Sequence, residues 1–189
     1  MNGRWIPNAI CVLRMLLAAP VAFTLLSGDY ATTLLLFAVA AASDGLDGWL
    51  AKTFGWTSRL GGILDPIADK LLLVTVIVML VVCGLVPAWL AASVVLRDVV
   101  IVGGATAYHF LIGRLDAHPT IVSKLNTLVQ LSFVLIVIGA AAWPAVPRPL
   151  VVALGAAMFV TTVVSGIDYV LTYARLAWRE SHRRPATVR

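Results

Sequence analysis

The sequence "DGLDGWLAKTFGWTSRLGGILDPIAD", residues 44–69, contains four aspartates in a chain that is otherwise strongly apolar. Asp44, Asp47, Asp65 and Asp69 are four of the nine acidic residues among 189. The chain is 61% hydrophobic and 12% charged, whereas a soluble domain is about 25% charged. A solvated loop or helix caps would be the simplest explanations of the cluster, but neither requires helical spacing on both sides of the loop.

Six apolar segments surround this stretch, and together they predict an all-α, polytopic membrane protein. A helix crosses the hydrocarbon core of a bilayer with about 20 residues, and breaks that contain Gly or Pro separate runs of that length. The predicted transmembrane helices cover residues 9–27, 30–53, 63–86, 88–112, 120–142 and 149–174. We expect an interfacial segment at 1–8, one six-helix transmembrane domain at 9–174 and a basic cytoplasmic tail at 175–189.

The lysines and arginines predict the orientation of the chain in the membrane. They occur at the N-terminus, in or beside the second and fourth breaks and above all in the tail, whereas the fifth break contains only Arg148. Because cytoplasmic loops are enriched in Lys and Arg, both termini and the aspartate stretch are predicted to be cytoplasmic. The same distribution explains the net charge of +5, so no nucleic-acid partner is expected.

The N-terminal segment and the cysteines indicate the cellular setting. Arg4 near the N-terminus is followed by an apolar run, as in a signal peptide, but no small-residue cleavage site precedes a polar mature chain, so the segment is predicted to remain as the first helix. No Arg- and Ser-rich transit peptide is recognisable, which favours a bacterial inner membrane. Cys11 and Cys83 lie in apolar runs without metal-ligand spacing and are predicted to be small buried residues.

The spacing of the aspartates predicts a divalent-metal site. Residues three or four positions apart share a face of a helix, which applies to Asp44 with Asp47 and to Asp65 with Asp69. The short connection between the two helices predicts antiparallel packing, which would bring the two pairs together. Four carboxylates in a partly desolvated site need a counter-charge. Oxygen ligands favour hard cations such as Mg²⁺ or Mn²⁺, and four carboxylates suffice for two ions.

Small and basic residues beside the aspartates predict a phosphate ligand. Glycine lets a phosphate approach the backbone closely, and cations add attraction for an anion. The small residues are Gly48, Ala51, Gly61 and Gly62, and the cations are Lys52, Arg59 and Lys70. A metal pair in these surroundings fits a pyrophosphate, because metal ions bridge phosphate oxygens.

The pattern Asp44-x-x-Asp47-Gly48-x-x-Ala51-Lys52, followed after eight residues by Gly61-x-x-x-Asp65-x-x-x-Asp69, resembles the signature of the CDP-alcohol phosphotransferases. Members of that family are six-helix membrane enzymes that transfer a phosphatidyl or similar group from a CDP-linked donor to an alcohol. Fixed residue types at fixed spacing make the resemblance specific. The family usually has Arg at the position of Lys52, and lysine offers a phosphate one ammonium group instead of a planar fork.

The resemblance implies a role for each residue of the pattern within a six-helix catalytic domain. Asp44, Asp47 and Asp65 would bind two metal ions, and Asp69 would contribute to the second. Asp69 would also be the general base that deprotonates the attacking hydroxyl. The residues that would bind the CDP part of the donor are Asp47, Gly48, Ala51, Lys52 and Gly61. Attack on the phosphorus that carries the lipid would release CMP.

Other stretches resemble two branches of this family. "IPNAICVLRMLLAAPVAF", residues 6–23, and "LRDVVI", residues 96–101, are similar to both phosphatidylglycerophosphate synthases and CDP-alcohol-type cardiolipin synthases. "RLDAHPTIVSKLNTLVQL", residues 114–131, is more similar to the cardiolipin synthases, because Asn126 stands where the other branch tends to have a lysine. The resemblance therefore implies CDP-diacylglycerol as donor and phosphatidylglycerol as acceptor, which gives cardiolipin. Glycerol 3-phosphate, which gives phosphatidylglycerophosphate, is the alternative acceptor.

Three basic residues are candidates for contact with the acceptor phosphate, namely Arg97, Lys124 and Arg59. Phosphatidylglycerol is less charged than glycerol 3-phosphate, so a neutral residue at position 126 suits it. Arg97 has the alternative of pairing with a carboxylate or carbonyl inside the bundle, and Lys124 that of extending to the cytoplasmic surface. Arg14 is expected to contact a lipid headgroup or to extend to the surface.

A divalent-cation membrane transporter is the alternative from another functional class, because intramembrane carboxylates also serve ion transport. A transporter would be expected to carry them near the midplane, on broken helices in related repeats. Here the aspartates gather on the cytoplasmic side and no repeat is visible. The expected partners are therefore CDP-diacylglycerol, its acceptor and membrane lipid, and the resemblance implies a homodimer.

Overall fold

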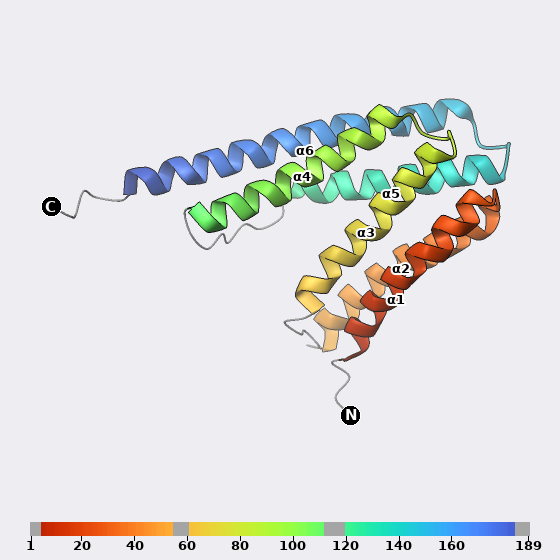
Figure 1. Ribbon diagram of the computed structural model, residues 1–189, viewed down its shortest axis with the longest axis horizontal. Helices are drawn as coiled ribbons and strands as arrows, with labels where there is room; N and C mark the ends of the chain where they lie inside the picture. Colours follow the sequence, from red (N-terminus) through yellow and green to blue (C-terminus); the bar gives the residue numbers. More distant parts are fainter. Residues whose placement is uncertain (1–4, 55–60, 112–119, 184–189) are drawn as a thin grey trace. The chain divides into compact units, whose positions relative to one another are not determined.

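The computed structural model describes the backbone of residues 5–54, 61–111 and 120–183 (Figure 1). Side chains are described within these ranges except at residues 5–8, 44–52, 54, 61–67, 107–111, 177 and 179–183. Six helices account for most of the described chain: α1 (Trp5–Leu26), α2 (Tyr30–Phe54), α3 (Gly61–Val82), α4 (Ala88–Leu111), α5 (Ile121–Ala142) and α6 (Arg148–Arg183). The all-α architecture and the helix order agree with the prediction.

The helix ends differ from the prediction mainly at the two termini. Helix α1 begins at Trp5, within the segment that we assigned to the interface, and α6 continues to Arg183, past the predicted end at residue 174. Residues 175–183, "RLAWRESHR", are rich in Arg, Leu, Ala and Glu, which have high helix propensities. The first part of the basic tail therefore extends α6.

Length and composition make several of these helices suitable for crossing a bilayer. Helices α1, α4, α5 and α6 contain apolar windows of sufficient length, and α2 contributes the shorter apolar segment Tyr30–Ser43. Large apolar side chains are exposed on the helix surfaces, for example Phe23 with 73% and Leu16 with 66% of its surface accessible. Such exposure is unusual for a soluble monomer and expected where lipid covers the helices. These features are those of a polytopic membrane protein.

The chain forms two compact units, which are described separately. Unit 1 comprises residues 1–88 and 131–152, and unit 2 comprises residues 89–130 and 153–189. Unit 1 contains the aspartate stretch. Unit 2 contains parts of α4, α5 and α6, with Arg97 on α4 and Lys124 on α5.

Helix α1 packs against both α2 and α3 in unit 1. The Thr33 hydroxyl of α2 donates to the Thr24 hydroxyl of α1 at 2.9 Å, so these helices run antiparallel. At the same end of α1, the Cys83 thiol that follows α3 contacts the Leu25 carbonyl oxygen at 3.6 Å, so α1 and α3 run parallel. The end of α2 and the beginning of α3 consequently lie at the same end of unit 1 (Figure 1).

A tight turn between α1 and α2 sets this arrangement. Gly28 has a φ of 77°, a left-handed conformation that glycine adopts without a steric penalty. Asp29 then caps α2, since its Oδ1 accepts a hydrogen bond from the Thr32 N–H at 3.1 Å. The hydrogen bonds from Thr32 lower the pKa of Asp29 below its ordinary value. This short connection fixes the register of α1 with α2.

Helices α4 and α6 pack closely within unit 2. The rings of Trp89 and Phe159 meet edge to face, with their centroids 5.4 Å apart. Further along, the Tyr173 ring covers Gly104, where an added Cβ would lie 2.7 Å from Tyr173 Cδ2. Gly104 thus permits a contact between α4 and α6 that no larger residue allows without a shift of the ring.

Substitution of Gly104 by alanine is expected to destabilise the protein by about 1–3 kcal/mol relative to the matched substitution of Gly103, because it overpacks the contact with Tyr173. The matched variant Gly103→Ala adds the same methyl group to the same helix, where nothing lies within 4 Å of it. Both variants gain the same helix propensity. Unfolding curves of the two proteins in detergent measure the difference, and equal stability would contradict the predicted overlap.

Candidate active site

The four aspartates lie on α2 and α3, where the end of α2 and the beginning of α3 lie at the same end of unit 1. Asp44 and Asp47 belong to α2, and Asp65 and Asp69 belong to α3. Both pairs are therefore helical, and each pair shares one face of its helix as predicted. Of the four side chains, the structure describes only that of Asp69.

Helix α1 also reaches this end of unit 1, through the side chain of Arg14. Its Nη1 donates to Oδ1 of Asp69 in a salt bridge across α1 and α3. The arginine side chain is 1% exposed, while that of Asp69 is 39% exposed. The expectation that Arg14 extends to the surface or contacts a lipid headgroup is therefore wrong, because the side chain is buried between helices.

The α1–α2 register places the backbone at Asp44 near the same level. Thr24 of α1 faces Thr33 of α2, and equal steps along the two antiparallel helices bring the level of Arg14 close to residue 43. The salt bridge of Arg14 marks the corresponding level on α3 at Asp69. One aspartate of each pair thus lies at the same level along α1, α2 and α3.

The chemistry of these donors fits divalent cations. All four predicted ligands are carboxylates, which hard cations such as Mg²⁺ and Mn²⁺ prefer. The contact of Asp69 with Arg14 uses Oδ1, and a carboxylate has a second oxygen with its own lone pairs. Within the described part of the chain, no three His, Cys, Asp or Glu side chains form a metal-binding group. The side chains of Asp44, Asp47 and Asp65 are not among those that the structure describes.

The residues predicted to bind the CDP donor are likewise described only in part. Gly48, Ala51 and Lys52 belong to α2 and Gly61 begins α3, but their side-chain surroundings lie outside the described residues, as does Arg59 altogether. Their positions agree with the spacing of the signature, and their roles as contacts to CDP stay a prediction.

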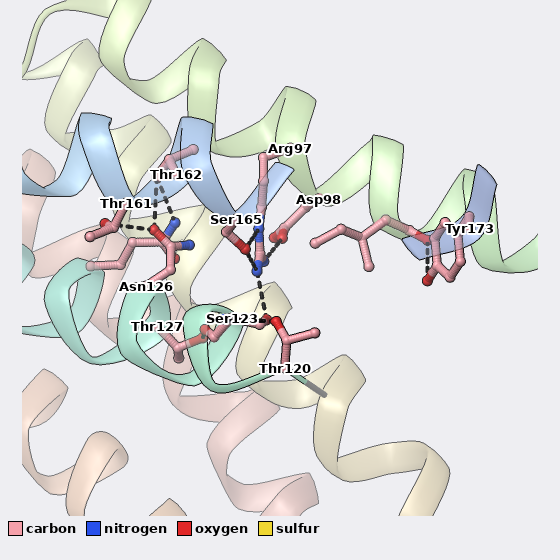
Figure 2. A network of polar contacts seen from close by, with 12 residues as sticks. Arg97, Asp98, Thr120, Ser123, Asn126, Thr127, Thr161, Thr162, Ser165 and Tyr173 are labelled. Atoms are coloured by element: carbon pink, nitrogen blue, oxygen red, sulfur yellow. Dashed lines mark hydrogen bonds and ion pairs between the residues drawn. The ribbon is translucent and has the colours of Figure 1, made fainter. Parts of the chain in front are cut away.

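A second polar site occurs in unit 2, where α4, α5 and α6 meet around Arg97 (Figure 2). Arg97 Nη2 donates to the hydroxyls of Ser123 and Ser165, each at 2.7 Å, and Nε donates to Ser165 at 3.2 Å. Nη1 donates to Asp98 Oδ1 at 2.8 Å. The guanidinium also lies 5.9 Å from the Tyr169 ring centroid. The predicted alternative of a carboxylate partner inside the bundle is therefore observed.

Arg97 is nearly saturated by these contacts, although one donor is left over. An arginine has five N–H groups, and four of them are engaged by Asp98, Ser123 and Ser165. Among the residues that the structure describes, the second N–H of Nη1 has no acceptor. Contact with a ligand phosphate is thus limited to that N–H unless the pair with Asp98 opens.

The first turn of α5 supplies the remaining polar groups of this site. Thr120 caps the helix, because its hydroxyl accepts a hydrogen bond from the Ser123 N–H at 3.2 Å. Lys124 follows on the exposed side. Asn126 is fully buried, and its Oδ1 accepts hydrogen bonds from Thr161 at 2.9 Å and from Thr162 at 3.0 Å. The Nδ2 group of Asn126 is buried without a partner among the described atoms.

Several polar residues of this site are absent from the predictions made from sequence. They are Ser123, Gln130, Thr161, Thr162 and Ser165, all of which take part in hydrogen bonds at the helix interfaces. Their spacing carries a signal, since 123, 126 and 130 on α5, and 162, 165 and 169 on α6, recur every three or four residues in apolar surroundings. Such a stripe predicts a polar seam between the helices.

Comparison with known proteins shows which proteins the chain resembles. The chain is 31% identical over 186 residues to a probable cardiolipin synthase (CMP-forming) of Drosophila melanogaster. The aligned region covers 90% of this chain and 58% of that protein. It is 31% identical over 149 residues to cardiolipin synthase (CMP-forming) of Homo sapiens, covering 70% and 50%. It is 33% identical over 139 residues to a probable phosphatidylglycerophosphate synthase of Mycobacterium tuberculosis, covering 71% and 62%.

The chain spans about half to three fifths of the length of these relatives. The sequence model of the family described as CDP-alcohol phosphatidyltransferase matches residues 4–174, which include both aspartate pairs, Arg14, Arg97 and Lys124. The chain belongs to the CDP-alcohol phosphatidyltransferase family.

Proposed function

We propose that this chain transfers the phosphatidyl group of CDP-diacylglycerol to phosphatidylglycerol, with release of CMP and formation of cardiolipin. The observation that carries the proposal is the partly exposed carboxylate of Asp69, which a buried arginine holds at the end of unit 1 where both aspartate pairs lie. Membership of the family supports the reaction type.

In this proposal the residues of the site act on the acceptor hydroxyl and on the donor pyrophosphate. Asp69 accepts the proton of the hydroxyl, whose oxygen attacks the phosphorus attached to diacylglycerol. A new P–O bond forms, the bond to CMP breaks, and the electron pair leaves with CMP. Two divalent ions, Mg²⁺ or Mn²⁺, bound by Asp44, Asp47, Asp65 and Asp69, would stabilise the charge that develops on the phosphate oxygens. Asp47, Gly48, Ala51, Lys52 and Gly61 are the proposed contacts of the CDP group.

The acceptor site is proposed to use the basic residues Arg97, Lys124 and Arg59. Lys124 is exposed on the first turn of α5, and Arg97 offers the N–H of Nη1 that has no acceptor among the described residues. The neutral Asn126, which is buried against α6 threonines, adds no further cation to α5. A phosphodiester with one negative charge suits such a site better than a phosphomonoester.

The membrane arrangement is proposed from the charge distribution along the sequence. Five arginines follow residue 174, and the breaks between the first and second and between the third and fourth helices contain no Lys or Arg. We infer that both termini and the active site face the cytoplasm of a bacterial inner membrane. A homodimer is part of the proposal on the strength of family resemblance.

An acceptor assay tests this function. Purified protein in detergent receives CDP-diacylglycerol with Mn²⁺ or Mg²⁺, and phosphatidylglycerol or glycerol 3-phosphate is added in separate reactions. Cardiolipin from the first reaction is the expected product, identified by mass together with released CMP. If only the second reaction gives a product, phosphatidylglycerophosphate, then glycerol 3-phosphate is the acceptor instead of phosphatidylglycerol. The similarity to the probable phosphatidylglycerophosphate synthase of Mycobacterium tuberculosis makes this the alternative to test. Metal uptake into vesicles without CMP release would favour the transporter.

A further inference from the structure

Arg14 occupies a position on α1 that otherwise suits small or apolar side chains. The buried face of this helix recurs every three or four residues and consists of Cys11, Arg14, Ala18, Val21 and Leu25, each at most 4% exposed. Burial of a guanidinium is costly unless the charge is paired. An arginine in this row therefore indicates a specific task for its charge, and the structure shows Asp69 as its partner.

The salt bridge is asymmetric in its access to solvent. Arg14 is 1% exposed, whereas Asp69 is 39% exposed. Arg14 therefore holds Oδ1 from a buried position, while the Asp69 side chain remains partly accessible to ligands. The arginine is a permanent cation at this position, since its side chain stays protonated in proteins.

We propose that Arg14 is a positioning residue that orients Asp69 and, through its fixed positive charge, keeps the affinity of the site for divalent metal ions moderate. The inference rests on the proposed role of Asp69 as a metal ligand. Two cations that share one carboxylate repel each other, and the repulsion is strong in a partly desolvated site. Release of Asp69 from Arg14 would also let its carboxylate rotate, which costs the metal site some preorganisation.

These two effects oppose each other, and we expect the charge to dominate metal affinity. Loss of orientation affects one short side chain with few rotamers, whereas the removal of Arg14 deletes a full charge beside a doubly charged ion. Removal of hydrogen-bonded groups behind metal ligands commonly costs about 10–100-fold in metal affinity, but Arg14 differs from such groups because its positive charge repels the metal ion. Arg14→Met is therefore expected to bind Mn²⁺ about tenfold more tightly than the wild-type protein, with a lower kcat because Asp69 is no longer oriented.

The experiment titrates Mn²⁺ alone into the full-length protein in detergent, without lipid substrates, and follows free Mn²⁺ by electron paramagnetic resonance. Arg14→Lys keeps the charge and is expected to keep the wild-type Mn²⁺ affinity and part of the turnover, so it tests the proposal even where Arg14→Met fails to fold. Thr33→Val is the matched control, because Thr33 is a fully buried polar residue at the other end of the same unit. It should leave Mn²⁺ affinity unchanged.

The outcomes separate this inference from the proposed function. Tighter Mn²⁺ binding by Arg14→Met together with wild-type affinity in Arg14→Lys would support the positioning role, whether or not the wild-type protein forms cardiolipin. Unchanged or weaker binding by a folded Arg14→Met protein, weaker binding by Arg14→Lys, or no Mn²⁺ binding by the wild-type protein would overturn it. Absence of CMP release from a wild-type protein that binds Mn²⁺ would overturn the proposed function alone.

Discussion

Replacement of Asp69 by asparagine is expected to lower kcat for CMP release by about 10²–10⁴-fold, because the variant loses the proposed general base. Asparagine has nearly the same shape as aspartate, and its amide oxygen can still accept a hydrogen bond from Arg14, which faces Asp69 in the structure. The hydrogen bond to Arg14 should therefore persist, while the proton acceptor, the counter-charge of Arg14 and one anionic metal ligand are lost. Initial rates at saturating donor and acceptor measure the effect.

Asp29→Asn is the matched control for this experiment. Asp29 belongs to the same unit and caps α2 from the turn after α1, and asparagine is an equally good N-cap residue. This control should retain wild-type kcat and stability. If a folded Asp69→Asn protein releases CMP with a kcat close to that of Asp29→Asn, Asp69 is not the general base.

Replacement of Arg97 by methionine is expected to destabilise the protein by about 3 kcal/mol, because it breaks a largely buried ion pair. Arg97 and Asp98 have side chains that are 7% and 15% exposed, and the guanidinium also satisfies the hydroxyls of Ser123 and Ser165. Denaturant or thermal unfolding in detergent measures the loss. Ser93→Ala on the same helix is the control, since the Ser93 hydroxyl, among the described residues, donates only to the Leu90 carbonyl oxygen of its own helix.

The double variant Arg97→Met/Asp98→Met separates packing from substrate contact at this site. Apolar replacement of both members of a buried pair often restores stability, so the double variant is expected to unfold nearly as the wild-type protein does. Its KM for phosphatidylglycerol should still be raised, because the N–H proposed to contact the acceptor phosphate is missing. A normal KM in the stable double variant would show that Arg97 serves the helix interface alone.

Much of the fold could be predicted because each helix is limited by local features of the sequence. Gly28 and Asp29 end one apolar run and cap the next, and the predicted boundaries of α2 agree with Tyr30–Phe54 to within one residue. Several apolar runs are about as long as a bilayer crossing or longer, and Gly and Pro occur at the breaks. The end of α6 could not be predicted in the same way, because the basic residues after 174 suit a cytoplasmic tail and a helix equally well.

The candidate site was predictable where its residues are close in sequence. Asp65 and Asp69 fall on one helical face because of their spacing alone. The partner of Arg14 was not predictable, since 55 residues separate it from Asp69 and an arginine near the start of an apolar helix can equally extend to the membrane surface. Arg97 likewise bonds to Ser165 across 68 residues. Only the packing of the helices shows which of these alternatives is realised.

The most direct test of the central claim follows the acyl chains from substrates to product. Purified protein receives divalent metal, CDP-diacylglycerol of one acyl composition and phosphatidylglycerol of another, and the products are identified by mass spectrometry. We predict cardiolipin that carries one acyl pair from each substrate, with one CMP released per cardiolipin and no product in excess chelator. Cardiolipin with acyl chains from phosphatidylglycerol only, accompanied by glycerol instead of CMP, would contradict phosphatidyl transfer from CDP-diacylglycerol.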